Sequence, residues 1–122
     1  MVEEVLNKNN GKGTITYSDF SKLDIVVAKI VEIEDIEKSD KLYKIKVQVS
    51  QSEYRILVAG LKEYYKKEQL LNKKIVLLAN LEPRKIRNIE SQGMLLAADD
   101  GKSVKLLTID DENNIEIGAK IR

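Results

Sequence analysis

The chain has 122 residues, of which 43% are hydrophobic and 34% are charged, with one proline and six glycines. This is the size and composition of one folded domain with a core of its own. Cysteine and histidine are both absent, which excludes a zinc finger, a Cys–His nucleophile pair and a Ser-His-Asp triad. The chain lacks an apolar run as long as a membrane span and an opening signal-peptide pattern, so we expect a cytoplasmic protein with no membrane partner.

The net charge of +1 is distributed unevenly along the chain. Residues 41–87 contain 12 Lys and Arg against four Asp and Glu, a local net charge of +8, and the remainder carries −7. A one-sided binding face for a polyanion produces this asymmetry within a small domain. A solvated surface whose charges cluster only in sequence produces it too, and the charges alone leave both interpretations open.

The first part of the chain is polar and rich in turn-forming residues. We expect residues 1–13 to be an N-terminal extension and residues 14–122 to form the domain. Residues 17–20 predict one short helical turn, for which Ser18 or Asp19 is the expected cap.

The middle and end of the chain have the branched, alternating pattern of short β-strands. An amphipathic stretch over residues 61–71 predicts a helical turn or two after the third strand, and the Asp-Asp-Gly-Lys turn at 99–102 predicts a further strand over 104–107. With only one helix available for crossovers, a small closed all-β barrel is favoured over a parallel sheet. The other predicted strands cover residues 25–33, 43–49, 54–61, 74–79 and 94–98.

Residues 78–98 contain the densest group of candidate binding residues. A helix cannot run through Pro83, so the cations after it project from a turn or short extended segment between two strands. These cations are Arg84, Lys85 and Arg87. Cations on a strand connection, beside a polar Glu-Ser-Gln-Gly corner, are suited to gripping a phosphate backbone.

This stretch, LANLEPRKIRNIESQGMLLAA, closely resembles the signature of the tRNA-binding domain family, found at the end of methionyl-tRNA synthetases and as a free-standing tRNA-binding protein. The resemblance extends over residues 15–122 and includes ITYSDFSKLDIVVAKIVEIE, SDKLY and RILVAGL. Three positions depart from the family: Val26 replaces a frequent Arg, Ala28 a usual Gly, and Asn88 a common Gly. Asn tolerates positive φ better than other non-glycine residues, so Asn88 can preserve a tight turn.

The resemblance implies a five-stranded Greek-key OB-fold barrel with a short helix between strands 3 and 4, which binds tRNA by shape and phosphate contacts. It implies a homodimer when the domain is a separate chain. A chain of 122 residues resembles that separate form. The expected function is non-catalytic: the beta subunit of methionyl-tRNA synthetase, with catalysis belonging to a partner catalytic subunit. We expect no cofactor, metal ion or small-molecule substrate. The alternative is a CsaA-like dimeric chaperone that binds unfolded or preprotein segments.

The candidate tRNA-binding residues fall into three groups. Arg84, Lys85 and Arg87 are the expected phosphate contacts. Ser91, Gln92 and Met94 suit unpaired bases or sugar edges, although Met94 could equally belong to the core. The remaining candidates are Lys41, a further binding cation, and Arg55 and Asn80. Arg55 could instead be merely exposed, and Asn80 could bond its own turn.

Overall fold

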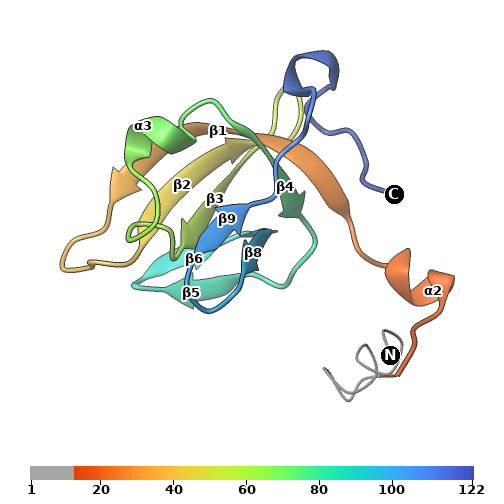
Figure 1. Cartoon of the computed structure of the whole chain (residues 1–122), viewed down its shortest axis with the longest axis horizontal. Coiled ribbons are helices and arrows are strands. Elements are labelled where there is room, and N and C mark those ends of the chain that lie inside the picture. Colours follow the sequence, from red (N-terminus) through yellow and green to blue (C-terminus); the bar gives the residue numbers. More distant parts are fainter. Residues whose placement is uncertain (1–12) are drawn as a thin grey trace.

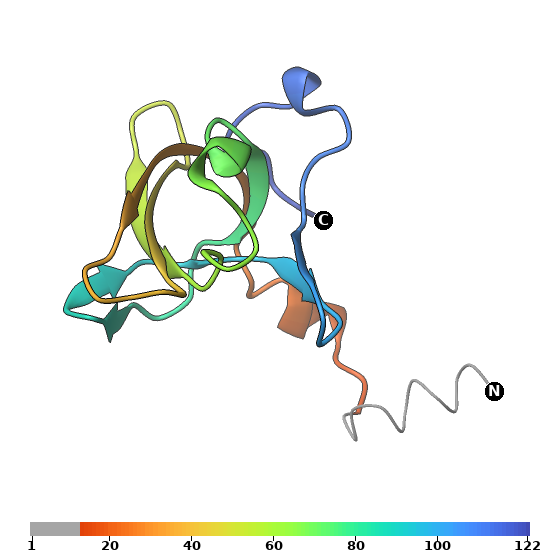
Figure 2. The same ribbon diagram turned by 60° about the vertical axis from the view of Figure 1, so that its left-hand side comes forward.

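An antiparallel five-stranded sheet curls into a nearly closed barrel in the computed structural model, which describes residues 13–122 (Figures 1 and 2). The strands lie in the order β3-β2-β1-β4-β7, and α3 (Lys67–Leu70) stands between β3 and β4 along the chain. The expected OB-fold barrel and the position of its helix are therefore confirmed. The barrel strands are β1 (Ile25–Asp35), β2 (Tyr43–Gln48), β3 (Tyr54–Ala59), β4 (Lys74–Leu78) and β7 (Met94–Leu95).

Four shorter strands form two hairpins beside the barrel. In one hairpin β5 (Arg84–Ile86) pairs with β6 (Ile89–Ser91), and in the other β8 (Ala97–Asp99) pairs with β9 (Val104–Leu106). The remaining elements are α2 (Tyr17–Phe20) and a 3₁₀ turn, η1 (Glu112–Asn114). None of the helices formed by residues 13–122 has the length and apolar character needed to cross a membrane.

The barrel interior follows the alternation seen in the sequence. In β2, Tyr43, Ile45 and Val47 are buried, whereas the Lys and Gln residues between them are only half-buried. α3 adds Leu70, which is fully buried. Burying such aliphatic side chains stabilises the domain by about 1.5–3 kcal/mol each. The largest fully buried side chains are Ile30, Ile45, Leu57, Leu70, Ile75, Leu77, Val27 and Val47.

The structure corrects the predicted cap of the first helix. Thr16 is the N-cap residue of α2: its hydroxyl accepts the Asp19 N–H at 3.0 Å, and the Asp19 carboxylate accepts the Thr16 N–H at 3.3 Å. Asp19 therefore completes a capping box from the third helical position. The prediction that Ser18 or Asp19 would be the cap was wrong because the helix begins at Tyr17, two or three residues earlier than those caps require.

Two other predicted elements differ clearly from the structure. The strand predicted over residues 94–98 divides at Leu96, because β7 pairs with β4 whereas β8 turns away to pair with β9. The helical segment predicted over residues 61–71 is regular only within α3, and Tyr64 and Leu71 are exposed. The expected N-terminal extension, residues 1–13, lies almost entirely outside the described residues.

The C-terminal residues add backbone pairing to the first half of β1. Val27 donates to the Ala119 carbonyl at 2.9 Å and accepts from Gly118 at 2.7 Å, and Ile121 donates to Ile25 at 2.8 Å. Val26, where the family often carries Arg, is buried in the core cluster. This position therefore offers no side chain to a phosphate in this chain.

Asp35, at the end of β1, links the barrel to the α3 region. Its carboxylate contacts Lys67 Nζ at 2.9 Å and Lys62 Nζ at 3.2 Å, and these hydrogen bonds, that of Lys67 first, lower the pKa of Asp35 from its ordinary 3.8. Because the folded pKa is depressed, the contribution is present above the unfolded value and is lost as the pH falls through the folded one.

We therefore expect Asp35→Asn to lower the thermal midpoint at neutral pH and to have no effect once acid has protonated Asp35 in the folded chain. Thermal unfolding followed by circular dichroism across an acid pH series measures this difference. A difference that stays constant over the whole series would contradict the role of the carboxylate charge.

Candidate nucleic-acid interface

The three predicted phosphate-binding cations lie on the β5–β6 hairpin. The register pairs Ile86 with Ile89, so Arg87 and Asn88 form a two-residue turn. Their φ angles are 54° and 66°, as a type I′ turn requires at both central positions. The expectation that Asn88 preserves a tight turn is confirmed. Arg87, by contrast, occupies a backbone conformation that few non-glycine residues adopt.

One face of this hairpin lines a hollow, and the other face does not. Strand alternation places Arg84 and Ile86 on the same face, with Ser91 opposite Arg84. These side chains line a hollow of about 110 Å³, here called the hairpin hollow. Lys85 lies on the other face. The full lining of the hairpin hollow is Val58, Leu81, Glu82, Arg84, Ile86, Ser91, Gly93 and Met94.

The predicted cations on this hairpin are exposed and free of ion pairs within the described chain. Arg84, Lys85 and Arg87 all lie on the surface, and within residues 13–122 no carboxylate forms an ion pair with them. Lys41, two residues before β2, is also exposed and forms no ion pair within the described residues. Their charges are therefore available to a phosphate without the loss of an internal ion pair.

Ser91 and Gln92 close the barrel against β3. The Gln92 side-chain oxygen accepts the Ile56 N–H at 3.0 Å, and the Gln92 N–H donates to the Ile56 carbonyl at 2.8 Å. The Ser91 hydroxyl accepts the Val58 N–H at 3.0 Å. These side chains take the place of backbone carbonyls along the seam, defined here as the meeting of β3 with residues 91–93. Their contact with tRNA stays a prediction.

We expect Ser91→Ala to destabilise the fold by about 1–3 kcal/mol, because it leaves the Val58 N–H at the seam without an acceptor. Urea unfolding of the wild type and the variant measures the loss. Ser103→Ala is the matched control, because the hydroxyl of this half-buried residue makes a single long hydrogen bond of 3.3 Å to Asp100. Equal effects of the two substitutions would contradict the role assigned to Ser91.

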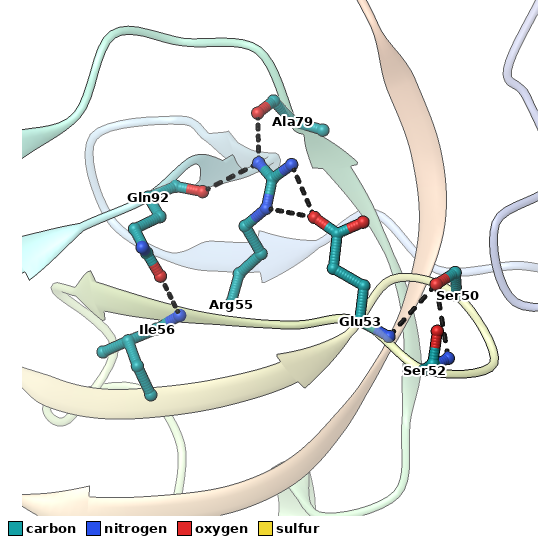
Figure 3. Close-up of polar contacts among 7 residues, drawn as sticks. All are labelled: Ser50, Ser52, Glu53, Arg55, Ile56, Ala79 and Gln92. Atoms are coloured by element: carbon teal, nitrogen blue, oxygen red, sulfur yellow. Dashed lines mark hydrogen bonds and ion pairs between the residues drawn. The ribbon is translucent and has the colours of Figure 1, made fainter.

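Arg55 joins β3 to the end of β4 and to the signature segment (Figure 3). Its guanidinium donates to the Ala79 carbonyl at 2.5 Å and the Gln92 carbonyl at 3.4 Å, and to the Glu53 carboxylate at 3.0 and 3.2 Å. The side chain is only 27% exposed. Each guanidinium nitrogen of Arg55 thus already donates to an acceptor within the protein. Contact of Arg55 with tRNA stays a prediction.

Asn80 and Met94 are both exposed, but only Asn80 forms side-chain hydrogen bonds within the protein. The Asn80 amide accepts the Asp24 N–H at 2.8 Å and donates to the Lys22 carbonyl at 2.7 Å, so it fixes the end of β4 to the segment that leads into β1. Met94 is 46% exposed, which places it on the surface rather than in the core. As a lining residue of the hairpin hollow, this flexible thioether can adapt to an apolar ligand surface.

Eight of the nine predicted residues lie in or beside two neighbouring hollows. The hairpin hollow contains Arg84, Ser91 and Met94, and a second hollow of about 330 Å³ contains Arg55, Asn80 and Gln92. Lys85 and Arg87 belong to the hairpin itself, whereas Lys41 belongs to neither lining. Sequence reasoning missed Leu81, which lines both hollows; its only sequence signal was its place inside the signature stretch. Among residues 13–122 no cluster of acidic side chains is suited to a metal ion.

Comparison with known proteins finds a family model and relatives that match most of the chain. Residues 25–120 match the family model described as "Putative tRNA binding domain". The methionine–tRNA ligase of Pyrococcus horikoshii is 56% identical over 108 residues, and that of Nanoarchaeum equitans is 51% identical over 110. The matched segments cover 88% and 90% of this chain, but the chain spans only 14% of the length of each ligase.

Solved structures show the same fold in separate chains. A MetRS-related protein from Pyrococcus horikoshii superposes with a TM-score of 0.83 at 28% identity, over 91% of this chain and all of that one. The CsaA chaperone protein from Picrophilus torridus superposes with a TM-score of 0.80 at 40% identity, over 89% of this chain and all of that one. The family match covers most of the sequence, and this chain therefore belongs to the tRNA-binding domain family.

Proposed function

We propose that the chain is a non-catalytic tRNA-binding protein that holds tRNA by its shape and its phosphates. The observation that carries this proposal is the β5–β6 hairpin, on which three exposed cations without internal ion pairs stand within the family signature. Phosphate contacts of this kind supply affinity and position without reading sequence. The protein has no tryptophan and one phenylalanine, which also favours backbone recognition over capture of single strands by stacking.

The candidate residues divide into two roles under this proposal. The cations and the exposed thioether contact the RNA: Lys41, Arg84, Lys85, Arg87 and Met94. The others hold the interface in place, because their side-chain polar groups already bond within the protein. They are Arg55, Asn80, Ser91 and Gln92.

We further propose that the chain acts as the beta subunit of methionyl-tRNA synthetase, in the cytoplasm, beside a separate catalytic subunit. Support comes from the ligases that contain a segment more than half identical to this chain. A second contact surface raises the effective affinity of the enzyme for tRNA by making the second binding event intramolecular. We expect addition of the chain to a catalytic subunit to lower the KM for tRNA in aminoacylation.

A homodimer is part of the same proposal. Ile15, Tyr17 and Leu23, around α2, are 67%, 81% and 39% exposed. Exposed large apolar side chains are a feature of protein–protein contact surfaces, and these three lie within nine residues of one another in the sequence. Sedimentation equilibrium of the wild type and of Tyr17→Asp would show a dimer that the substitution weakens.

The proposed function is tested by measuring the binding of the purified chain to total tRNA, duplex DNA and an unfolded peptide across a salt series. Tight binding to tRNA with a steep salt dependence, and weak binding to the other two, is the expected result. Binding to tRNA no tighter than to duplex DNA would show a general polyanion affinity and would overturn the proposal.

One observation favours the CsaA-like alternative, a chaperone for unfolded or preprotein segments. A largely apolar groove of about 390 Å³ opens between the end of β3 and the β7–β8 segment. Its accessible walls include Met94, Leu95, Leu96 and Ala97, which an extended apolar peptide could contact. Peptide binding that survives removal of the hairpin cations, without tRNA binding, would establish this function instead.

A further inference from the structure

Two cations of the described chain have unusual backbone conformations and contact each other. Four non-glycine residues among residues 13–122 have positive φ, and two of them are asparagines, which tolerate that region. The other two are Arg87, with φ 54°, and Lys38, with φ 63°. The Arg87 guanidinium donates to the Lys38 carbonyl at 3.4 Å, although 49 positions separate them in the sequence.

Lys38 belongs to a tight turn in the loop between β1 and β2. The Ser39 N–H donates to the Ile36 carbonyl at 3.0 Å, so Glu37 and Lys38 are the two central residues of the turn. Positive φ at the second central position is the property of a type II turn, which favours Gly or Asn there. A lysine at that position has a strained backbone conformation, and residues with strained backbones are common at functional sites.

The turn is anchored on both sides of Lys38. Ile36 and Ser39 are buried, at 8% and 6% exposure. The Ser39 hydroxyl accepts the Leu42 N–H at 3.1 Å, and the Ser39 carbonyl accepts Lys62 Nζ at 3.2 Å. Lys38 itself is exposed. Its backbone is therefore held by buried neighbours while its side chain stands in solvent.

The loop and the hairpin tip lie side by side. Figures 1 and 2 both show the β1–β2 loop next to the β5–β6 hairpin, in agreement with the Arg87–Lys38 hydrogen bond. Glu37 and Asp40 are the exposed acids of this loop, and within the described chain neither forms an ion pair with Lys38. Two unpaired cations thus meet on neighbouring loops.

We propose that Lys38 is a further tRNA-binding residue, which contacts the phosphate backbone together with Arg87 across the β1–β2 loop and the hairpin tip. The inference rests on the proposed function and adds to it a second loop that sequence reasoning did not identify. The hydrogen-bonded turns already fix the backbone at both positions, so the backbone of neither residue has to be ordered when a phosphate binds.

Lys38→Asn tests the inference, because Asn removes the charge and suits positive φ better than lysine. We expect several-fold weaker binding to total tRNA and a salt slope shallower by about 0.7–0.9, the change for one phosphate contact. Lys38→Arg should keep both the affinity and the slope. The thermal midpoint of Lys38→Asn should equal or exceed that of the wild type, which separates lost charge from lost folding.

The matched control is Lys102→Asn, in the turn between β8 and β9, which Figure 2 shows far from the β5–β6 hairpin. It should leave binding unchanged. The inference alone fails if the wild type binds tRNA and Arg87→Asn weakens that binding, but Lys38→Asn leaves the affinity and the slope unchanged. If the wild type does not bind tRNA, the proposed function has failed and this inference fails with it.

Discussion

Replacement of Arg84, Lys85 and Arg87 by glutamine in one variant is expected to lower the affinity for total tRNA about 100-fold. Each exposed charge pair with a phosphate contributes at most about 1 kcal/mol, and about 1.4 kcal/mol corresponds to a tenfold change in affinity. The salt slope should become shallower by about 2–3, because three phosphate contacts are removed. The loss should be similar across tRNA species, since phosphates do not report sequence.

The measurement is fluorescence anisotropy of labelled tRNA titrated with protein at several salt concentrations. The matched control is Lys66, Lys102 and Lys105 replaced together by glutamine, which removes the same charge from other exposed positions. If both triple variants bind equally weakly, overall charge rather than the hairpin determines the affinity. A loss confined to one tRNA species would show base readout and would contradict phosphate recognition.

Gly93→Ala is expected to destabilise the fold by about 3 kcal/mol or more. Gly93 has a φ of 137°, a conformation that L side chains rarely adopt, and a Cβ there would lie 3.0 Å from the Leu78 carbonyl oxygen. Backbone strain of this kind costs about 1–3 kcal/mol, and forcing atoms into a packed region adds about 1–3 kcal/mol. The barrel seam runs through this residue, so the backbone cannot move away without breaking the bonds of Ser91 and Gln92.

Gly101→Ala separates the contribution of backbone strain from that of the close contact made by the added Cβ. Gly101 also has positive φ, 88°, but a Cβ there would meet nothing within 4 Å. It should cost only the left-handed backbone penalty of about 1–2 kcal/mol. Urea unfolding of both variants gives the comparison, and a Gly93→Ala loss no larger than that of Gly101→Ala would show that the close approach at the seam is relieved without cost.

Local patterns in the sequence predicted most of the elements. Strand alternation identified the β2 core face correctly, because the period of two places Tyr43, Ile45 and Val47 on the same side whatever the surroundings. Pro83 correctly excluded a helix before the cations. The OB topology could not be derived from these patterns, since strand order depends on pairing between distant segments; the family resemblance provided it.

The predicted ends of helices and strands were less accurate than their positions. The end of an element depends on specific hydrogen bonds, which residue patterns in the sequence do not show. The cap of α2 is Thr16, since its hydroxyl and the Asp19 carboxylate form reciprocal bonds. The strand expected over residues 94–98 divides because β4 pairs with its first half only. In both cases a specific partner, rather than residue preference, decided the boundary.

The sequence by itself determined the chemistry available to this protein: cations at Arg84, Lys85 and Arg87 in an extended connection, and no side chains for zinc-finger or triad chemistry. The tertiary structure alone decided which polar groups remain free. It engages Arg55, Asn80, Ser91 and Gln92 in internal hydrogen bonds, leaves the hairpin cations exposed, and brings Lys38 beside Arg87. The physical reason is that exposure and hydrogen-bond partners are properties of packed neighbours, and packing joins residues far apart in the chain.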